Sequence, residues 1–410
     1  MSRYVQLVFA LGLFTGIACI KWPDGPAPPA KLTNTFDLQK LRTIGSAITK
    51  ARAEKRLPGG VLWVEHNGVH YTRAYGKACV EPIHILAQRD TIYDAASLTK
   101  VVATTSAVLL LHERGKLTIN NPVKKYLPEF TGDGRGAVTL RHLLTHTSGL
   151  RPDISLDGWN GHAECIAKCV AEKLRSKPGE QFKYSDINFQ LLDEIIRRVT
   201  GQRLDVFCEK EIFGPLKMTD TGYNPPAAKH NRVAPTTVTN GKALLGIVHD
   251  PRARKTEGVA GHAGLFTTAP DLARYARMLL QEGELDGVRL FKTETVKLMT
   301  TVQTPAALSA RRGLGWDIDT GYSSPRGEKN GTQFPLGSFG HTGFTGPSIW
   351  IDPHSQTFVI FLCNRVHPTE KGPSVIPLRR TIGTLAAEAV KGFDFDDVPD
   401  ALPGRHGSPK

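Results

Sequence analysis

A serine and a lysine three residues apart are the first pair in this chain whose types and spacing could do chemistry. Ser97 and Lys100 follow a short β-like run at residues 91–93 and open a long apolar run at residues 101–112. Side chains at i and i+3 share one face of a helix, so the hydroxyl and the amine would meet across less than one turn. Serine needs a neighbouring base to become a good nucleophile, and burial favours the neutral amine that could be that base. The alternative is a helix-capping serine beside a surface lysine.

A second stretch, Tyr184-Ser185-Asp186, leads into an apolar helical run. If Tyr184 lies near Ser97, its phenol can relay a proton where nearby cations stabilise the phenolate. Asp186 could orient Lys100 through a hydrogen bond. The alternative is that Asp186 only caps the helix.

A third stretch, at residues 340–346, is rich in glycine and precedes a strand pattern. Glycines let a ligand approach the backbone closely, and a backbone N–H there could join those of the helix N-terminus in an oxyanion hole. His341 and Thr342 could hold a polar or anionic group of a substrate. The alternative is a glycine-rich turn with an incidental histidine.

The elements that must position these stretches follow from apolar periodicity. A helix is predicted at 36–55, and two strands at 61–64 and 69–71 flank a hairpin turn at His66-Asn67-Gly68. Helical runs dominate the middle of the chain, at 101–114, 140–145, 163–174, 187–200 and 204–212. A helix at 271–281, strands at 348–352 and 357–364 and a closing helix at 381–390 follow.

Both ends of the chain thus supply α and β pieces, whereas the middle supplies helices. We therefore predict an α/β (α+β) fold, in which an antiparallel sheet flanked by helices is formed from both termini and an all-α domain is inserted. The predicted domain covers 31–392, with the α/β part at about 31–95 and 240–392 and the insert at about 96–239. Residues 393–410 form a tail, and a cleft between the two parts is where we expect the site.

The N-terminus has the pattern of a targeting segment. Arg3 supplies the positive flank, and the run at residues 5–20 is too short for a comfortable membrane span. Gly16-Ile17-Ala18-Cys19 resembles a lipoprotein cleavage site only in part, so a cleaved signal, a lipid anchor on Cys19 and an uncleaved anchor all stay open. Residues before about 30, which end in a proline-rich linker, are excluded from the fold. We expect an exported protein, either periplasmic or anchored to a membrane and facing the periplasm.

The net charge of +13 would suit an anionic partner such as a cell-wall polymer. The lysines and arginines are spread along the chain, and no zinc-finger, basic-helix or RNA-binding pattern is present, so no nucleic-acid partner is predicted. The six cysteines have no metal-site spacing, and the five other than Cys19 would leave at least one free thiol. His146 and His262 lack metal-ligand partners and are interpreted as packing or loop histidines. No metal and no organic cofactor are predicted.

Together the three stretches resemble those of the serine β-lactamase and penicillin-binding protein superfamily, nearest to class C β-lactamases and their esterase and D-peptidase relatives. The match comprises Ser97-Leu98-Thr99-Lys100, then Tyr184-Ser185-Asp186 where class C enzymes have Tyr-x-Asn, then His341-Thr342-Gly343 where they have Lys-Thr-Gly. Residues 143–150 and 258–266 also look familiar, and the resemblance covers roughly residues 35–392.

The resemblance implies a mechanism. Ser97 would attack a carbonyl and form an acyl-enzyme, and Lys100 would be its general base or would keep Tyr184 ionised as that base. Tyr184 would protonate the leaving group. The N–H groups of Ser97 and Phe344 would form the oxyanion hole, and Asp186, His341, Thr342 and Gly343 would contact the substrate.

Two departures from the pattern argue against an efficient β-lactamase. His341 replaces a lysine that binds the substrate carboxylate, and histidine is largely neutral at pH 7. Asp186 replaces an asparagine whose amide binds the acyl amide of β-lactams. The expected function is an exported serine hydrolase acting on D-amino-acid peptides of the cell wall (a D-Ala-D-Ala carboxypeptidase-like reaction, with peptidoglycan as a candidate partner) or on small esters and amides. A β-lactamase and a non-catalytic scaffold remain the alternatives, and the oligomeric state is left open.

Overall fold

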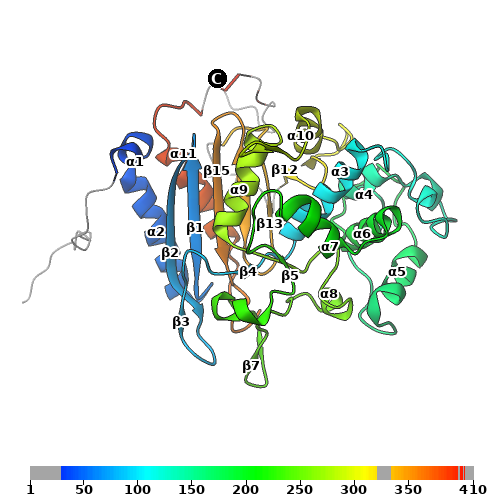
Figure 1. Cartoon of the computed structure of the whole chain (residues 1–410), viewed down its shortest axis with the longest axis horizontal. Helices are drawn as coiled ribbons and strands as arrows, with labels where there is room; N and C mark the ends of the chain where they lie inside the picture. The colour runs from blue at the N-terminus through cyan, green and yellow to red at the C-terminus, as the bar shows by residue number, and fades with distance from the viewer. Residues whose placement is uncertain (1–28, 321–333, 396–397, 400, 402–410) are drawn as a thin grey trace, which may run out of the picture.

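A large antiparallel sheet forms the centre of the computed structural model, which describes residues 29–320, 334–395, 398–399 and 401 (Figure 1). Its strand order is β11-β12-β13-β14-β15-β1-β2-β3. Strand β1 from the N-terminal part pairs with β15 from the C-terminal part, from Gly60↔Cys363 to His66↔Thr357. The strands are β1 (Gly59–His66), β2 (Val69–Cys79), β3 (Ile85–Leu86), β11 (Arg311–Arg312), β12 (Asp317–Asp319), β13 (Phe339–Thr342), β14 (Ser348–Asp352) and β15 (Thr357–Cys363).

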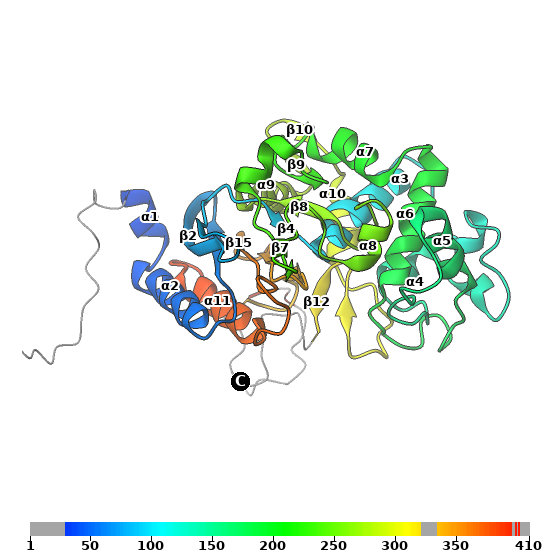
Figure 2. The same ribbon diagram turned by 90° about the horizontal axis from the view of Figure 1, so that it is seen from below.

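The two faces of this sheet are covered by different helices. Alternation along β1 sends Leu62 and Val64 into one apolar cluster and Val61 and Trp63 into another. The first cluster holds α2 (Leu38–Ala53) and α11 (Ile376–Ala389), and the second holds α9 (Ala269–Leu280). Figures 1 and 2 show α2 and α11 side by side on the face opposite α9. A further short helix, α1 (Ala30–Thr35), precedes α2.

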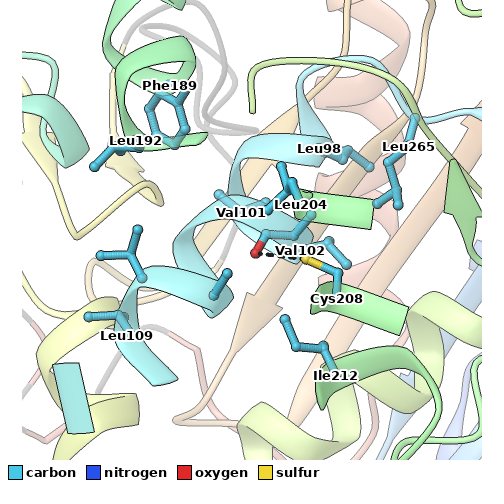
Figure 3. Packing of buried hydrophobic residues seen from close by; sticks show 14 of the residues in the cluster. Leu98, Val101, Val102, Leu109, Phe189, Leu192, Leu204, Cys208, Ile212 and Leu265 are labelled. Carbon is cyan, nitrogen blue, oxygen red and sulfur yellow. Dashed lines mark hydrogen bonds between the residues drawn. The ribbon is translucent and has the colours of Figure 1, made fainter. Parts of the chain in front are cut away.

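The middle of the chain is mostly helical and packs beside the sheet (Figures 1 and 2). In its core, Leu98, Val101 and Val102 lie among apolar side chains from three other segments (Figure 3). These are Phe189 and Leu192, Leu204 and Cys208, and Leu265. The helices are η1 (Lys100–Thr105), α3 (Ser106–Glu113), η2 (Val123–Lys125), η3 (Arg135–Ala137), α4 (Leu140–Leu144), α5 (Gly161–Ala171), α6 (Asp186–Thr200), α7 (Leu204–Cys208), η4 (Glu209–Phe213), η5 (Ala227–Arg232), α8 (Pro251–Lys255) and α10 (Thr293–Thr300). Short strands form three small sheets: β4 (Tyr93–Asp94), β8 (Leu265–Thr267) and β5 (Gly222–Tyr223); β6 (Val238–Thr239) and β7 (Lys242–Ala243); β9 (Glu284–Leu285) and β10 (Val288–Arg289).

The predicted fold class is confirmed, since an antiparallel sheet is built from both ends of the chain. The hairpin turn is also as predicted: Asn67 and Gly68 both have positive φ, as a two-residue turn between twisted strands requires. The closing helix begins earlier than predicted, at Ile376, because Pro377 stands in its first turn, where a missing N–H breaks no bond. The helix predicted at 101–114 consists of the π-helical turn η1 followed by α3.

The predicted targeting segment, including Cys19, lies outside the described residues, as does most of the C-terminal tail. None of the helices in the described part of the chain is both long and apolar enough to span a bilayer. The other five cysteines are all buried and unbridged.

Candidate active site

The turn that carries Ser97 is held in an unusual backbone conformation. Ala96 has φ of 45°, a left-handed conformation that costs a non-glycine residue about 1–3 kcal/mol. The buried carboxylate of Asp94 stabilises this turn, because Oδ1 accepts the Ala96 N–H at 2.8 Å and Oδ2 accepts the His249 N–H at 2.7 Å. Ser97 is half-buried while its neighbours on both sides are buried. The turn therefore exposes the hydroxyl and little else.

Lys100 is fully buried and its ammonium has three oxygen acceptors. Nζ lies 3.1 Å from Ser97 Oγ, 3.0 Å from the His262 carbonyl and 2.7 Å from Asp186 Oδ1. An ammonium has three N–H donors, and these oxygens share them with the Tyr184 hydroxyl, to which Lys100 also hydrogen bonds. The i, i+3 spacing has thus brought the hydroxyl and the amine together as predicted, and Asp186 orients Lys100 rather than capping α6, whose N-cap is Ser185.

Two roles were expected for Lys100, as the general base itself or as the cation that keeps Tyr184 ionised, and its surroundings bear on the choice. Burial by itself lowers the pKa of Lys100, but the charge of Asp186 and the hydrogen bond to Tyr184 outweigh it, so the net shift is upward. Lys100 is therefore a cation at neutral pH. Because it donates a hydrogen bond to Ser97 Oγ, the proton of the Ser97 hydroxyl is free to point elsewhere.

Tyr184 lies over this cation, with its ring centroid 5.0 Å from Lys100 Nζ. His146 stacks on the phenol ring at 4.3 Å and 25°, and its Nδ1 accepts the Ser185 N–H at 3.0 Å. Burial and the nearby Arg312 and Lys100 charges hold the pKa of His146 well below its usual range, so this imidazole is neutral. His146 is thus a packing histidine, as expected, but what it packs against is the candidate phenol.

Arg312 is a second cation near Tyr184 that sequence reasoning missed. Its side chain is fully buried, with the guanidinium carbon 6.0 Å from the Tyr184 ring centroid and 3.6 Å between Nη1 and Asp317. No local pattern marks it, because it reaches the site from β11, more than a hundred residues further along the chain. His146, in contrast, could have been found from its place in the familiar 143–150 stretch.

The strand side of the site lies directly against the Ser97 turn. A Cβ on Gly343 would stand 2.8 Å from the Ala95 carbonyl and 3.1 Å from the Ala96 Cβ, and Thr345 Oγ1 donates to the Asp94 carbonyl at 2.9 Å. Among residues 29–320 and 334–395, no acceptor is found for the backbone N–H of Ser97 or of Phe344. Two N–H groups without a described acceptor thus lie on adjoining segments, as an oxyanion hole requires.

His341 is buried on β13 and faces Tyr184, with the two ring centroids 6.1 Å apart. Its Nδ1 donates to the Thr342 carbonyl at 2.9 Å, which leaves Nε2 as an acceptor without a partner in the described part of the chain. Burial and the charges of Arg312 and Lys100 hold the pKa of His341 well below its usual range. Position 341 is thus neutral. Thr342 is half-buried at the end of the same strand.

His262 contributes through both its backbone and its side chain. Its carbonyl accepts from Lys100, and its imidazole lies 3.1 Å from Asp250. Burial opposes the charge, but Asp250 raises the pKa of His262 to about 9. Among the residues that the structure describes, no group of histidines, cysteines and carboxylates could hold a metal ion.

Comparisons with known proteins identify the family of this chain. The β-lactamase family model matches residues 44–383. A protein of Escherichia coli (strain K12) named "Putative D-alanyl-D-alanine carboxypeptidase" is 30% identical over 441 aligned positions, which cover 98% of this chain and 99% of that protein. A solved class C β-lactamase has a TM-score of 0.71 at 20% identity, over 87% of this chain and 98% of its own. The octameric penicillin-binding protein homologue from Pyrococcus abyssi has a TM-score of 0.64 at 25% identity, over 82% of this chain and 76% of its own. Since the family model spans most of the chain, this protein belongs to the β-lactamase family and is a serine hydrolase.

Proposed function

We propose that the protein is exported and cleaves D-amino-acid-containing peptides of the cell wall through an acyl-enzyme on Ser97. The observation that carries this proposal is the position of the Lys100 ammonium, which contacts both the Ser97 hydroxyl and the Tyr184 phenol. A charged lysine cannot take the serine proton, but it attracts a phenolate strongly in a buried setting. Tyr184 is therefore the better candidate for the base.

In the acylation step, Ser97 Oγ attacks the peptide carbonyl carbon while its proton passes to the Tyr184 oxygen. The carbonyl oxygen becomes an oxyanion held by the N–H groups of Ser97 and Phe344. The C–N bond then breaks, and Tyr184 returns the proton to the leaving amine. The products of this half are the ester on Ser97 and a free D-amino acid.

In the deacylation step, water attacks the ester carbonyl and gives its proton to Tyr184. The ester C–O bond breaks, and the proton returns to Ser97 Oγ. Lys100 keeps its charge throughout, because Asp186 and the His262 carbonyl hold it on both sides. Both halves thus need one proton carrier and one fixed cation.

The choice of a cell-wall peptide is supported by the name of the Escherichia coli relative, by the net charge of +13 and by the targeting pattern at residues 1–20. Export itself is tested by mass analysis of the protein recovered from cells. Removal of residues before about 30, or a lipid on Cys19, is the expected result. A full-length, unmodified chain in the cytoplasm would contradict it.

The enzymatic proposal is tested with a peptide ending in D-Ala-D-Ala and with a fluorescent penicillin. We expect release of D-alanine and a covalent adduct that peptide mapping places on Ser97. The Ser97→Ala variant should lose both by at least about a thousandfold, because the residue forms the covalent intermediate. If the wild-type protein neither releases D-alanine nor forms the adduct, the proposal is overturned. If cells that carry Ser97→Ala keep the phenotype of the wild type, a non-catalytic scaffold protein is favoured. Nitrocefin turnover should be slow, whereas rapid turnover would indicate a β-lactamase.

A small ester is the second candidate substrate, and the neutral His341 favours it. An uncharged imidazole binds a substrate carboxylate more weakly than a lysine would. Nitrophenyl esters with and without a carboxylate distinguish the two cases, since an esterase would prefer the uncharged ester.

A further inference from the structure

A cavity of about 210 Å³ lies beside the middle of α6, away from Ser97. Its lining comes from four segments: His162 at the start of α5, Asp193 and Arg197 on α6, Arg203 just before α7, and the segment at residues 256–259. None of the candidate site residues lines it. Asp193 follows Asp186 by seven residues on the same helix, which places it about 10 Å further along the axis.

Two opposite charges line this cavity without pairing. The Asp193 side chain is only 4% exposed, yet no hydrogen bond or ion pair to its carboxylate is found within the described residues. Arg197 Nε is also buried without an acceptor there. The two residues have i, i+4 spacing, at which an acid and a base normally pair on a helix. One position further along, Glu194 and Arg198 have the same spacing and do pair, at 2.7 Å.

The other charged groups around the cavity already have partners. His162 Nε2 lies 2.8 Å from Glu194, and Arg203 pairs with Asp205 at 2.9 Å. Burial raises the pKa of Asp193 to about 6, so its carboxylate is charged at neutral pH. A buried charge without a partner is costly. Within the described part of the chain, the cavity therefore presents the Asp193 carboxylate and the Arg197 Nε–H, neither of which has a hydrogen-bond partner there.

We infer that this cavity binds a small zwitterion of the α-amino acid class, with its ammonium on Asp193 and its carboxylate on Arg197. A ligand with a single charge would satisfy only one of the two groups. The cavity volume of about 210 Å³ is sufficient for an amino acid with a small side chain.

The same cavity borders the segment that holds Lys100. Thr256 and Val259 line it, and the chain continues to Gly261, where a Cβ would stand 3.0 Å from the Asp193 Cβ, and to His262, whose carbonyl accepts from Lys100. A bound amino acid would therefore steady one of the supports of the candidate nucleophile pair. If the proposed function is right, the released D-amino acid belongs to the ligand class, but the binding inference itself does not depend on it.

The test uses calorimetric titration of the full-length Ser97→Ala protein at neutral pH with glycine, D-alanine and L-alanine. Ethylamine and propionate serve as probes that lack one charge each. We expect at least one amino acid to bind, and both single-charge probes to bind at least about tenfold more weakly, since each loses a hydrogen bond to a charged group. Because Ser97→Ala cannot form an acyl-enzyme, this result is independent of whether the wild-type protein is a peptidase.

Variants at the cavity separate this site from the candidate active site. Asp193→Asn and Arg197→Gln should each weaken binding at least about tenfold, whereas the matched control Arg198→Gln should change it less than twofold. If Asp193→Asn fails to fold, Arg197→Gln still tests the inference, because Arg197 is only half-buried and its replacement disturbs the core less. In the wild type, hydrogen exchange of the amides at 256–262 should slow when the amino acid is added. Absence of binding by all three amino acids at millimolar concentration, or equal binding by wild type and Arg197→Gln, would overturn the inference.

Discussion

The candidate site has two walls of different character. The helical wall is formed by residues 94–100, 184–186 and His262. It carries the charged groups of Lys100 and Asp186 and the phenol of Tyr184. The strand wall, formed by residues 341–347, carries a neutral histidine and a backbone N–H. Proton transfer is thus assigned to the helical wall, whereas the proposed oxyanion hole takes one N–H from each wall. A change in the helical wall should therefore affect proton transfer, and a change in the strand wall should affect oxyanion binding alone.

The two walls are also stabilised in different ways. Side-chain ion pairs and hydrogen bonds fix the helical wall, as at Lys100 and Asp186. The strand wall is fixed through its backbone: Arg379 donates to the carbonyls of Gly343 at 2.5 Å, Gly346 at 3.2 Å and Pro347 at 3.1 Å. Burial lowers the pKa of Arg379 to about 10, which still leaves it charged at neutral pH. Charge changes should therefore perturb the helical wall most, and steric changes the strand wall.

The largest effect is expected from Tyr184→Phe. The variant keeps the ring packing but removes the proton carrier, so kcat/KM for the peptide should fall by about a thousandfold. Lys100 stays charged and cannot replace the phenol. Steady-state kinetics measure the loss, with Tyr126→Phe, a phenol that hydrogen bonds only to Thr118 and Asn121 among its described contacts, as control. If the variant retained a tenth of the activity, Tyr184 would not be the proton carrier, and the assignment of proton transfer to the helical wall would be wrong.

Gly343→Ala should give the next largest effect, by a steric route. The added Cβ would stand 2.8 Å from both the Ala95 carbonyl and Pro347 Cγ, so the strand wall must move away from Ser97. A misplaced oxyanion donor costs about 3 kcal/mol, or about a hundredfold in acylation rate. Stopped-flow labelling with the fluorescent penicillin measures this rate. Gly222→Ala, where nothing lies within 4 Å of the new Cβ, is the control and should react normally.

Asp186→Asn should have a smaller effect with a distinctive pH dependence. Losing the carboxylate leaves burial to lower the pKa of Lys100, so the alkaline limb of the pH–rate profile should move to lower pH. In the wild type the raised pKa of Lys100 stabilises the folded state. This stabilisation is fully present below the pKa of the unfolded state, near 10.4, and is lost as the pH rises through the higher pKa of the folded state. We expect about a tenfold loss of kcat/KM at neutral pH. The control is Asp157→Asn, a change at an exposed aspartate, which should leave the profile unchanged. An unchanged alkaline limb in Asp186→Asn as well would show that Asp186 does not control the charge of Lys100.

His262→Gln should affect stability more than activity, since the carbonyl that binds Lys100 is kept. The folded pKa of His262 is raised from 6.5 to about 9 by Asp250. The stabilisation is therefore fully present below pH 6.5 and is lost as the pH rises through about 9, with a total of about 3 kcal/mol. Urea unfolding of wild type and variant across this range measures the difference. A difference that does not change with pH would contradict the ion pair.

The sequence predicted the parts of the site whose geometry is local. Ser97 and Lys100 lie three residues apart, and both Lys100 and Asp186 begin helices, so their meeting required only that two helix starts converge. The net pKa of Lys100 was not predictable, because it depends on the balance between burial and the charge of Asp186, which is a tertiary contact. Arg312 and the close approach of Gly343 to Ala95 depend on chain crossings that no local pattern records.

The same distinction holds for the fold. The stretch at 348–352 predicted β14 with its observed ends, because a short apolar run followed by a turn signal is typical of a strand buried on both faces. The short strands β11 and β12 have too few residues for a period and were not predicted. Likewise, the π-helical turn at Lys100 has the same apolar pattern as an α-helix and differs only in its hydrogen bonds.

The pairing of β1 with β15 has a consequence for how activity arises during synthesis. β1 cannot complete its hydrogen bonding until the last fifth of the chain has been made, and the second N–H donor, at Phe344, enters with that same part. A ribosome-bound fragment ending before residue 340 would contain the candidate nucleophile, Ser97, yet lack the proposed second oxyanion donor at Phe344. Hydrolysis should therefore switch on only when translation is nearly finished, and such fragments should be inert towards acylating reagents.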